Sequence, residues 1–175
     1  MEWNRDLTPI KMKSAKKFLA IILSLITILS FGATASAEEN WKDLLGTVVD
    51  GSVLTDADKS TGYAREEAAR GYYLADGTSY IEDKGNGLIY ISGSTSCYRT
   101  AEEVRTDVYL QKLVNGTWVT VTYQYDSEYN TYYGHNGFYI TVTPGYYYRT
   151  MTNHIAIKGD AFESMTSRTD GLYIG

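Results

Sequence analysis

The chain has one thiol and two imidazole side chains that could serve nucleophilic catalysis, Cys97, His135 and His154. A serine or cysteine hydrolase needs a nucleophile, a base and a group that orients the base. No G-x-S-x-G elbow and no cysteine-protease signature surrounds these residues. A hydrolase that uses Cys97 or His154 is therefore only the third functional hypothesis. Cys97 is expected to be a small buried residue at a strand end, because free cysteines are usually buried.

Acidic residues give no convincing acid/base pair or metal site. Glu66-Glu67 and Glu102-Glu103 are adjacent pairs, whose side chains point to opposite faces of a strand. The stretch 56–60 begins like a calcium loop and has a glutamate at the twelfth position, but Thr61 stands where the loop needs glycine. One cysteine and two distant histidines lack the spacing of zinc ligands. The sequence therefore predicts no metal and no cofactor.

Tyrosine is the remaining lead, with 17 residues in the chain. Several of them gather in the predicted loop around 125–130 and in the two strand-like runs that follow it over 131–142, which are expected to meet at a turn near His135-Asn136-Gly137. Exposed aromatic rings with polar edges are suited to stacking on sugars or to contacting a protein partner. The alternative is an ordinary core and rim, since scattered surface aromatics need no explanation. The candidate binding residues are Tyr132, Tyr133, His135 and Tyr139.

The first 37 residues have the pattern of a secretory signal peptide. Basic residues at 11–17 precede an apolar run from Phe18 to Phe31, and Ala35-Ser36-Ala37 forms an A-x-A cleavage site. The run is shorter than the ~20 apolar residues that a membrane-spanning helix needs. We expect cleavage after Ala37 and a secreted mature chain. Met12 is an alternative start to Met1, because the basic region follows it directly.

Charge and cysteine content limit the partners of the mature chain. The signal segment holds five basic and two acidic residues, so residues 38–175 have 11 basic and 19 acidic residues and a net charge of −8. Such an acidic chain is poorly suited to nucleic acid or to an anionic membrane surface. A single cysteine forms no internal disulfide. Stability must therefore come from the core.

The clearest structural element is a predicted hairpin over Val108–Gln124. Asn115-Gly116 is a strong signal for a two-residue turn, because both residues adopt positive φ at little cost. The turn predicts that Leu113 faces Trp118, that Leu110 faces Val121 and that Val108 faces Tyr123. The residues expected on the core face are Val108, Leu110, Val119, Val121 and Tyr123. The residues expected on the solvent-exposed, wet face are Tyr109, Gln111, Thr120 and Thr122.

The remaining chain alternates short strand-like runs with turn signals about every ten residues, and no helix–strand alternation is visible. This pattern predicts an all-β fold, an antiparallel sandwich of the immunoglobulin or fibronectin type. We expect the sandwich to span 70–175. Residues 38–69 are expected to be a mostly irregular N-terminal segment, with at most two helical turns over 38–49, a linker over 50–62 and a marginal helix over 63–70.

A tyrosine corner is predicted where the chain enters a late strand. In immunoglobulin-like sandwiches, a tyrosine hydroxyl at such a corner binds a backbone group a few residues upstream. The stretch VTPGYYYR from Val142 has this character. Tyr146 or Tyr147 is the expected donor.

Several stretches of the chain also resemble a known group of proteins. They are RGYYL at 70–74, GLIYISGST at 87–95, NGTW at 115–118, PGYYYR at 144–149, and His154. Together they resemble an uncharacterised group of small secreted proteins of Gram-positive bacteria, which carry a domain of unknown function. The resemblance covers 70–175 and implies secretion and one compact domain. It implies no activity, cofactor or catalytic residue.

Three functions follow from these observations. The leading hypothesis is a secreted, non-enzymatic β-sandwich module that binds a cell-envelope glycan or a protein. The second is a secreted toxin or bacteriocin-like effector, which would act on neighbouring cells. The third is the hydrolase considered above.

Overall fold

The computed structural model of the protein describes residues 41–64 and 72–175. The expected signal peptide with its cleavage site after Ala37, the two candidate start residues, and nearly all of the expected helix over 63–70 lie outside these residues. So does Glu67, the twelfth position of the calcium-loop pattern. Within the described residues, no helix combines the length and the apolar character needed to cross a membrane.

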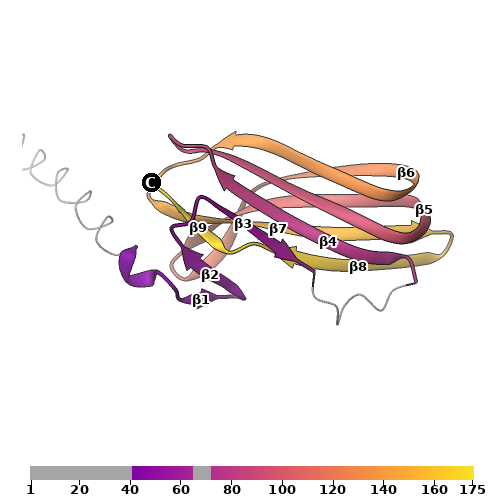
Figure 1. Ribbon diagram of the computed structural model, residues 1–175, viewed down its shortest axis with the longest axis horizontal. Coiled ribbons are helices and arrows are strands. Elements are labelled where there is room, and N and C mark those ends of the chain that lie inside the picture. Colours follow the sequence, from indigo (N-terminus) through magenta and orange to yellow (C-terminus); the bar gives the residue numbers. More distant parts are fainter. Residues whose placement is uncertain (1–40, 65–71) are drawn as a thin grey trace, which may run out of the picture. The chain divides into compact units, whose positions relative to one another are not determined.

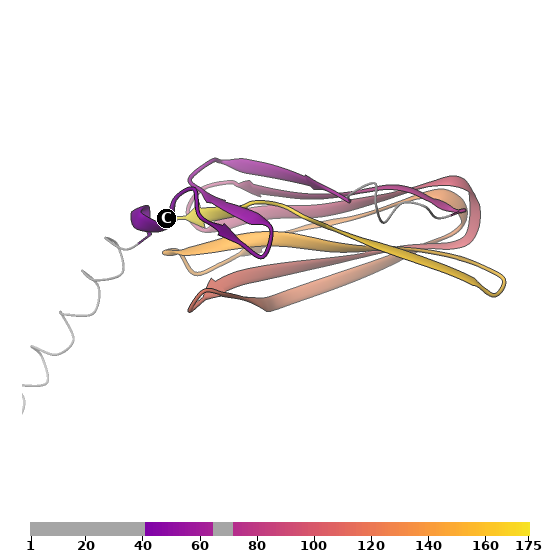
Figure 2. The ribbon, with the colours of Figure 1, turned by 90° about the horizontal axis from the view of Figure 1, so that it is seen from below.

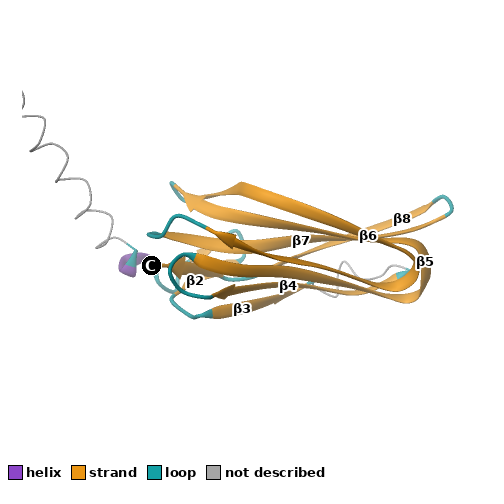
Figure 3. Ribbon diagram, turned by 90° about the horizontal axis from the view of Figure 1, so that it is seen from above, coloured by secondary structure: helices purple, strands orange, loops and turns teal. Residues whose placement is uncertain are grey.

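The described chain is almost entirely β-structure, as predicted (Figures 1 and 3). One short 3-10 turn, η1, spans Lys42–Leu44. The strands are β1 (Val48–Val49), β2 (Ser52–Thr55), β3 (Lys59–Tyr63), β4 (Leu74–Asp83), β5 (Leu88–Val114), β6 (Thr117–Thr141), β7 (Tyr146–Lys158), β8 (Ala161–Arg168) and β9 (Gly171–Ile174).

These strands form a single mixed sheet that curls over like a half-barrel (Figure 2). The hydrogen-bonded order is β1-β2-β9-β7-β5-β4-β3, with β6 beside β5 and β8 beside β7. The β2–β9 pair is parallel, whereas the other pairs are antiparallel. The prediction of an immunoglobulin-like or fibronectin-like sandwich is not confirmed, because the strands are joined in one sheet.

The long β5–β6 ribbon continues through the curl of the sheet and connects its two halves. Its register shifts between Ser96 and Ala101. Before the shift β5 pairs with β4 on its other side, and after the shift it pairs with β7. The ribbon thereby belongs to two halves of the sheet. We call β3, β4, the start of β5 and the end of β6 the first half-sheet, and the remaining strands the second.

The inner space between the half-sheets is apolar toward one end. Its buried residues come from both halves of the sheet. They are Ile81, Ile89 and Ile91 from the first half-sheet and Val108, Leu110, Tyr148, Leu172 and Ile174 from the second, with Val142 beside them. Burying such side chains contributes about 1.5–3 kcal/mol each relative to their exposure. This cluster is the main apolar core.

A buried polar network lies beside this core and surrounds His154, whose side chain is fully buried. The His154 ring contacts Thr95 Oγ1 through Nδ1 at 2.9 Å and Ser167 Oγ through Nε2 at 2.8 Å. Ser167 Oγ lies 2.6 Å from Ser79 Oγ, and Thr95 Oγ1 lies 2.7 Å from Thr106 Oγ1. The imidazole and these hydroxyl groups satisfy one another, which offsets the cost of removing them from water.

Glycine permits the close approach that this network requires. A methyl group at Gly77 would lie 2.3 Å from the His154 ring, and one at Gly93 would lie 2.5 Å from Thr152 Cγ2. Real Cβ atoms do not sit that close to other atoms. The two half-sheets therefore meet at positions without side chains.

The predicted hairpin forms, and its tip is confirmed. Asn115 and Gly116 both have positive φ, at 50° and 75°, and Leu113 pairs with Trp118. Beyond Gln111 the predicted register is wrong, because a bulge inserts Val121 as an extra residue. Leu110 therefore faces Thr122 instead of Val121. Val108 likewise faces Gln124 instead of Tyr123.

The burial of the hairpin follows the prediction on only one strand. Val108 and Leu110 on β5 are buried as expected. On β6, Val119, Val121 and Tyr123 were assigned to the core and are instead exposed. Of the residues expected to be wet, Gln111 is buried because its amide oxygen accepts a hydrogen bond from Arg149 Nε. The hairpin thus buries β5 and presents much of β6 to solvent.

The N-terminal segment is more regular than the sequence predicted. Residues 50–62 were expected to be a linker, yet β2 pairs with β9 and β3 pairs with β4 over five residues. Pairing with distant strands overrides the turn-like composition of this stretch. Backbone hydrogen bonds to the edge of a neighbouring strand do not require apolar side chains. Within the described residues 41–49, helical structure is limited to the single turn η1, and β1 begins at Val48.

A tyrosine does secure the predicted corner, but it is one residue further along. Tyr148 Oη donates to the Thr143 carbonyl oxygen at 2.8 Å. Tyr147 donates instead to the Trp41 carbonyl oxygen at 2.7 Å, and Tyr146 is exposed. Strand alternation separates Tyr148 from Tyr147, because Tyr148 shares the inward face with the main apolar core and Tyr147 lies on the opposite face of the strand.

Candidate ligand-binding face

The structure places all four predicted binding residues on one continuous strand. A loop over 125–130 and a turn near His135-Asn136-Gly137 were expected, but β6 runs through both. Tyr133, His135 and Tyr139 occupy alternate positions of β6 and share the outer face of the first half-sheet. Tyr132 has the opposite alternation and is exposed near the bend of the ribbon. Three of the four residues are therefore brought to one face.

This outer face of the first half-sheet combines hydroxyl groups and rings. His135 Nδ1 lies 3.1 Å from Ser94 Oγ, and Tyr133 Oη donates to the same oxygen at 3.3 Å. Tyr139 packs against Tyr90, with ring centroids 4.8 Å apart. These side-chain contacts lie on an open surface.

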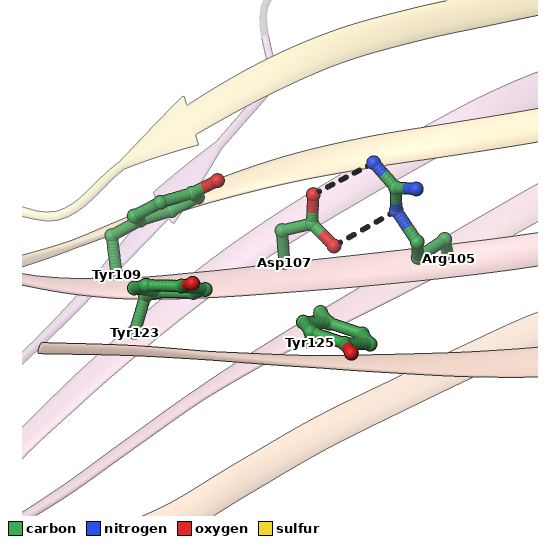
Figure 4. Close-up of a pocket in the computed structure, with 5 residues that line it drawn as sticks. All are labelled: Arg105, Asp107, Tyr109, Tyr123 and Tyr125. Carbon is green, nitrogen blue, oxygen red and sulfur yellow. Dashed lines mark hydrogen bonds and ion pairs between the residues drawn. The ribbon is translucent and has the colours of Figure 1, made fainter.

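A more concave site lies on the outer face of the second half-sheet (Figure 4). Arg105, Asp107 and Tyr109 alternate along β5 and project from the same face. On β6, Tyr123 stands opposite Tyr109, and Tyr125 stands opposite Asp107. These five side chains line a hollow of about 270 Å³. We call this site the tyrosine hollow.

An ion pair forms the polar part of the tyrosine hollow. Arg105 Nε lies 3.0 Å from Asp107 Oδ1, and its Nη2 donates to Oδ2 at 3.2 Å, so the guanidinium meets both oxygens of the carboxylate. The Asp107 residue is only 6% exposed, whereas the Arg105 side chain is 38% exposed. A two-point pair of this kind holds both groups in a fixed orientation.

Tyrosine rings form the apolar part of the same hollow. The Tyr109 and Tyr123 rings stack with their centroids 5.6 Å apart and an interplanar angle of 23°. Tyr123 and Tyr125 are 59% and 65% exposed. Figure 4 shows the three rings beside the Asp107–Arg105 pair. The hollow thus offers ring faces for stacking together with oriented hydrogen-bonding groups.

A second hollow of about 330 Å³ lies nearer the hairpin tip, on the same side of the sheet. Its central group, Arg149, is only 1% exposed. The Arg149 guanidinium lies 4.5 Å from the Trp118 ring centroid and pairs with Asp50 Oδ2 at 2.7 Å. It also donates to the Asp50 carbonyl oxygen and to Ser52 Oγ, each at 3.0 Å.

These contacts give Arg149 a structural role. The hydrogen bond from Arg149 lowers the pKa of Asp50, and burial lowers the pKa of Arg149 itself. The donors that would recognise a ligand are already occupied by the β1–β2 turn and by Gln111. The buried guanidinium therefore fastens that turn to the sheet.

Of the residues considered for catalysis, Cys97 and His154 lie inside the sheet, whereas His135 is exposed on its outer face. Cys97 is 8% exposed, and burial raises the pKa of its thiol to about 11, so the reactive thiolate is disfavoured. Burial lowers the pKa of His154 to about 4, and its two ring nitrogens contact hydroxyl groups rather than a carboxylate. Within residues 41–64 and 72–175, no cluster of three His, Cys, Asp or Glu side chains could hold a metal ion.

The sequence contained a signal for the tyrosine hollow that the hairpin analysis did not use. Arg105, Asp107 and Tyr109 alternate on one strand, and Tyr123 and Tyr125 alternate on the next. The bulge at Val121 obscured the match, because it changes which residues stand opposite one another. Counting from the turn alone therefore misaligned the two runs.

The chain matches no known family model, and no curated protein is significantly similar to it.

Proposed function

We propose that the protein is exported and binds an oligosaccharide of the cell envelope through the tyrosine hollow. Export is supported by the basic and apolar N-terminal segment with its A-x-A site, and by the resemblance to small secreted proteins. Glycan binding is supported by one observation above all. Exposed tyrosine rings flank a buried carboxylate that is held in place by a guanidinium.

The chemistry of the hollow fits a sugar better than an apolar ligand. A sugar ring has apolar C–H faces that stack on an aromatic ring and hydroxyl groups around its edge. Tyr123 and Tyr125 supply the ring surfaces. Asp107 can accept hydrogen bonds from hydroxyl groups, and the remaining N–H groups of Arg105 can donate to them. The exposed outer face also leaves room for a ligand that continues along the sheet.

The binding face needs no catalytic group, which fits a non-enzymatic module. Binding sites of this kind commonly gain affinity from a few aromatic anchors, each of which can contribute 1 kcal/mol or more. The acidic net charge of residues 38–175 favours neutral or basic glycans over strongly anionic ones.

The test is retention of the purified protein on insoluble cell-envelope polysaccharide, followed by calorimetry with soluble fragments. We expect the Tyr123→Ala/Tyr125→Ala double variant to bind at least tenfold more weakly. The Tyr63→Ala/Tyr98→Ala double variant is the matched control, because both tyrosines are similarly exposed and lie outside the hollow. Control binding should equal that of the unchanged protein.

A third variant distinguishes the two tyrosine surfaces. Tyr132→Ala/Tyr133→Ala removes rings of the sequence-predicted site and leaves the tyrosine hollow intact. A loss of retention in this variant alone would move the site to the first half-sheet. Absence of retention for the unchanged protein on every glycan fraction would contradict glycan binding altogether.

A further inference from the structure

The outer edge of β6 is unpaired in the part of the chain that the structure describes. β6 is 25 residues long and pairs only with β5, so its other edge faces away from the sheet. An exposed strand edge presents N–H and C=O groups that can pair with another chain.

The phase of the β5–β6 ladder shows which backbone groups point outward. Val142 N donates to the Gly87 carbonyl oxygen at 2.8 Å, next to the Leu88–Thr141 pair. In an antiparallel ladder, hydrogen-bonded and non-hydrogen-bonded pairs then alternate. Asn136, Phe138 and Ile140 therefore bond to β5. The backbone groups of His135, Gly137 and Tyr139 point to the outer edge.

Tyr133, the next residue in this alternation, marks where the unpaired stretch begins. Its N–H donates to Thr131 Oγ1 at 3.2 Å, and its carbonyl oxygen accepts from the same hydroxyl group at 3.2 Å. A nearby side chain thus satisfies the outward groups of Tyr133. The open part of the edge follows it and is centred on Gly137.

The two arms of β6 differ in how they are protected against pairing. The arm from Thr117 to Asn130 contains the bulge at Val121 and the acidic residues Asp126 and Glu128. Bulges and charges are the usual means of preventing edge-to-edge association. The arm from Thr131 to Thr141 is Thr-Tyr-Tyr-Gly-His-Asn-Gly-Phe-Tyr-Ile-Thr, with no Lys, Arg, Asp, Glu or Pro, and its pairing with β5 from Tyr133 onward contains no register shift.

We propose that two copies of the chain associate through this arm, as an antiparallel β6–β6 pair with its two-fold axis at Gly137. His135 of each copy then stands opposite Tyr139 of the other, and the two Gly137 residues face each other. Each of these pairs exchanges two backbone hydrogen bonds. Beyond them, Gly134 stands opposite Ile140, so a small residue meets a large one.

Charge and symmetry favour a second copy as the occupant. A closed two-fold contact uses the same patch on both partners and leaves no further edge of this kind open. The pairing places only uncharged side chains in contact, which suits two chains that are both acidic. The antiparallel direction also keeps Asp126 and Glu128 of the two copies at opposite ends of the contact. Edge-to-edge pairing leaves both outer faces of the sheet open.

The first test is sedimentation velocity of the purified protein over a wide concentration range, combined with amide hydrogen exchange. We expect a reversible monomer–dimer equilibrium. The amides of His135, Gly137 and Tyr139 should exchange quickly when dilute and at least tenfold more slowly when concentrated. Those of Asn136 and Phe138 should be protected at both concentrations. A monomer at every concentration would overturn the proposal.

Variants then locate the contact. Tyr139→Pro removes an outward N–H and no hydrogen bond to β5, so we expect a folded monomer. His135→Lys places a charge in the contact and should also abolish the dimer, whereas Val119→Lys changes another exposed position, on the protected arm, and should not. Persistent protection of the Phe138 amide shows that each variant is folded. A dimer that survives both Tyr139→Pro and His135→Lys would refute pairing through this edge.

Discussion

Single residues of this protein show how an unusually polar interior is made stable. His154 is fully buried and uncharged, and its neighbours on both half-sheets are hydroxyl groups. No apolar pattern in the sequence distinguishes such a histidine from a ligand or a catalytic base. Its environment is decided by residues far away in the chain, such as Thr95 and Ser167.

The first prediction concerns the acid stability that His154 controls. Burial lowers the pKa of His154 from 6.5 to about 4, so the unfolded chain binds a proton that the folded chain does not. Stability should therefore fall as the pH drops below 6.5, and the loss should level off near pH 4 at about 3 kcal/mol for this group. Urea unfolding between pH 7 and pH 4 measures this effect.

Two substitutions separate His154 from other acid-sensitive groups. His154→Gln should be less stable at pH 7 but should show a flatter pH dependence of the unfolding free energy. His135→Gln is the matched control, because it removes the exposed histidine instead of the buried one. Equal slopes in the unchanged protein and in His154→Gln would show that the buried imidazole does not titrate as described.

The strands and turns were predictable to different degrees. The turn at Asn115-Gly116, the burial of Val108 and Leu110, and the all-β composition follow from local chemistry, and the structure confirms them. The bulge at Val121 has no local sequence signal, and one extra residue reverses the faces of everything beyond it. The strands within 50–62 were missed because their pairing partners, not their own side chains, determine them.

The same reasoning applies to the candidate site. The sequence named Tyr133, His135 and Tyr139 as candidates, but it placed a turn near His135 and did not show that one strand face carries all three or that the hollow forms around Asp107. The hollow depends on the register of β5 against β6 and on a carboxylate–guanidinium pair. Both depend on tertiary structure, which cannot be read from a single sequence.

The second prediction concerns the start of β4, which Glu163 of β8 anchors. Its carboxylate accepts hydrogen bonds from the backbone N–H groups of Tyr72, Tyr73 and Leu74 at 2.7, 2.9 and 2.8 Å. Burial, the largest effect, raises the pKa of Glu163, but the three donors together lower it below its ordinary value. This contribution to stability is present above the ordinary pKa and is lost as the pH falls through the lowered one.

Glu163→Gln should therefore cost about 2 kcal/mol at pH 7, because a neutral amide offers a single, weaker acceptor oxygen. Hydrogen exchange should become faster at Tyr72, Tyr73 and Leu74 while the amides of β7 remain protected. Glu128→Gln, on the exposed arm of β6, is the control and should change neither quantity. Unchanged exchange at the start of β4 in Glu163→Gln would show that this anchor does not hold the strand.

At the scale of the whole molecule, the distance between the two half-sheets is set by glycine. Gly77 faces the His154 ring and Gly93 faces Thr152, so the backbones approach where a side chain would separate them. A curled sheet closed in this way can tolerate a hydroxyl-rich interior, since short distances allow hydroxyl groups such as those of Ser79, Thr95 and Ser167 to find partners.

The third prediction tests this spacing. Gly77→Ala places a methyl group against the buried imidazole, so the half-sheets must separate or the ring must move. We expect a loss of about 1–3 kcal/mol in thermal or urea unfolding. Thr78→Ala changes the adjacent outward position and should cost much less. A Gly77→Ala protein as stable as the unchanged one would mean that the interior yields easily at this point.

The parallel pair of β2 and β9 has a consequence for how the chain acquires its structure. Ser52 of β2 contacts Thr169 just before β9, across 117 residues of sequence. Contacts between such distant segments form slowly, because a long loop must close before they contribute any stability. Strands β1 and β2 can be locked in place only when β9 is present. This part of the molecule therefore reaches its final form late.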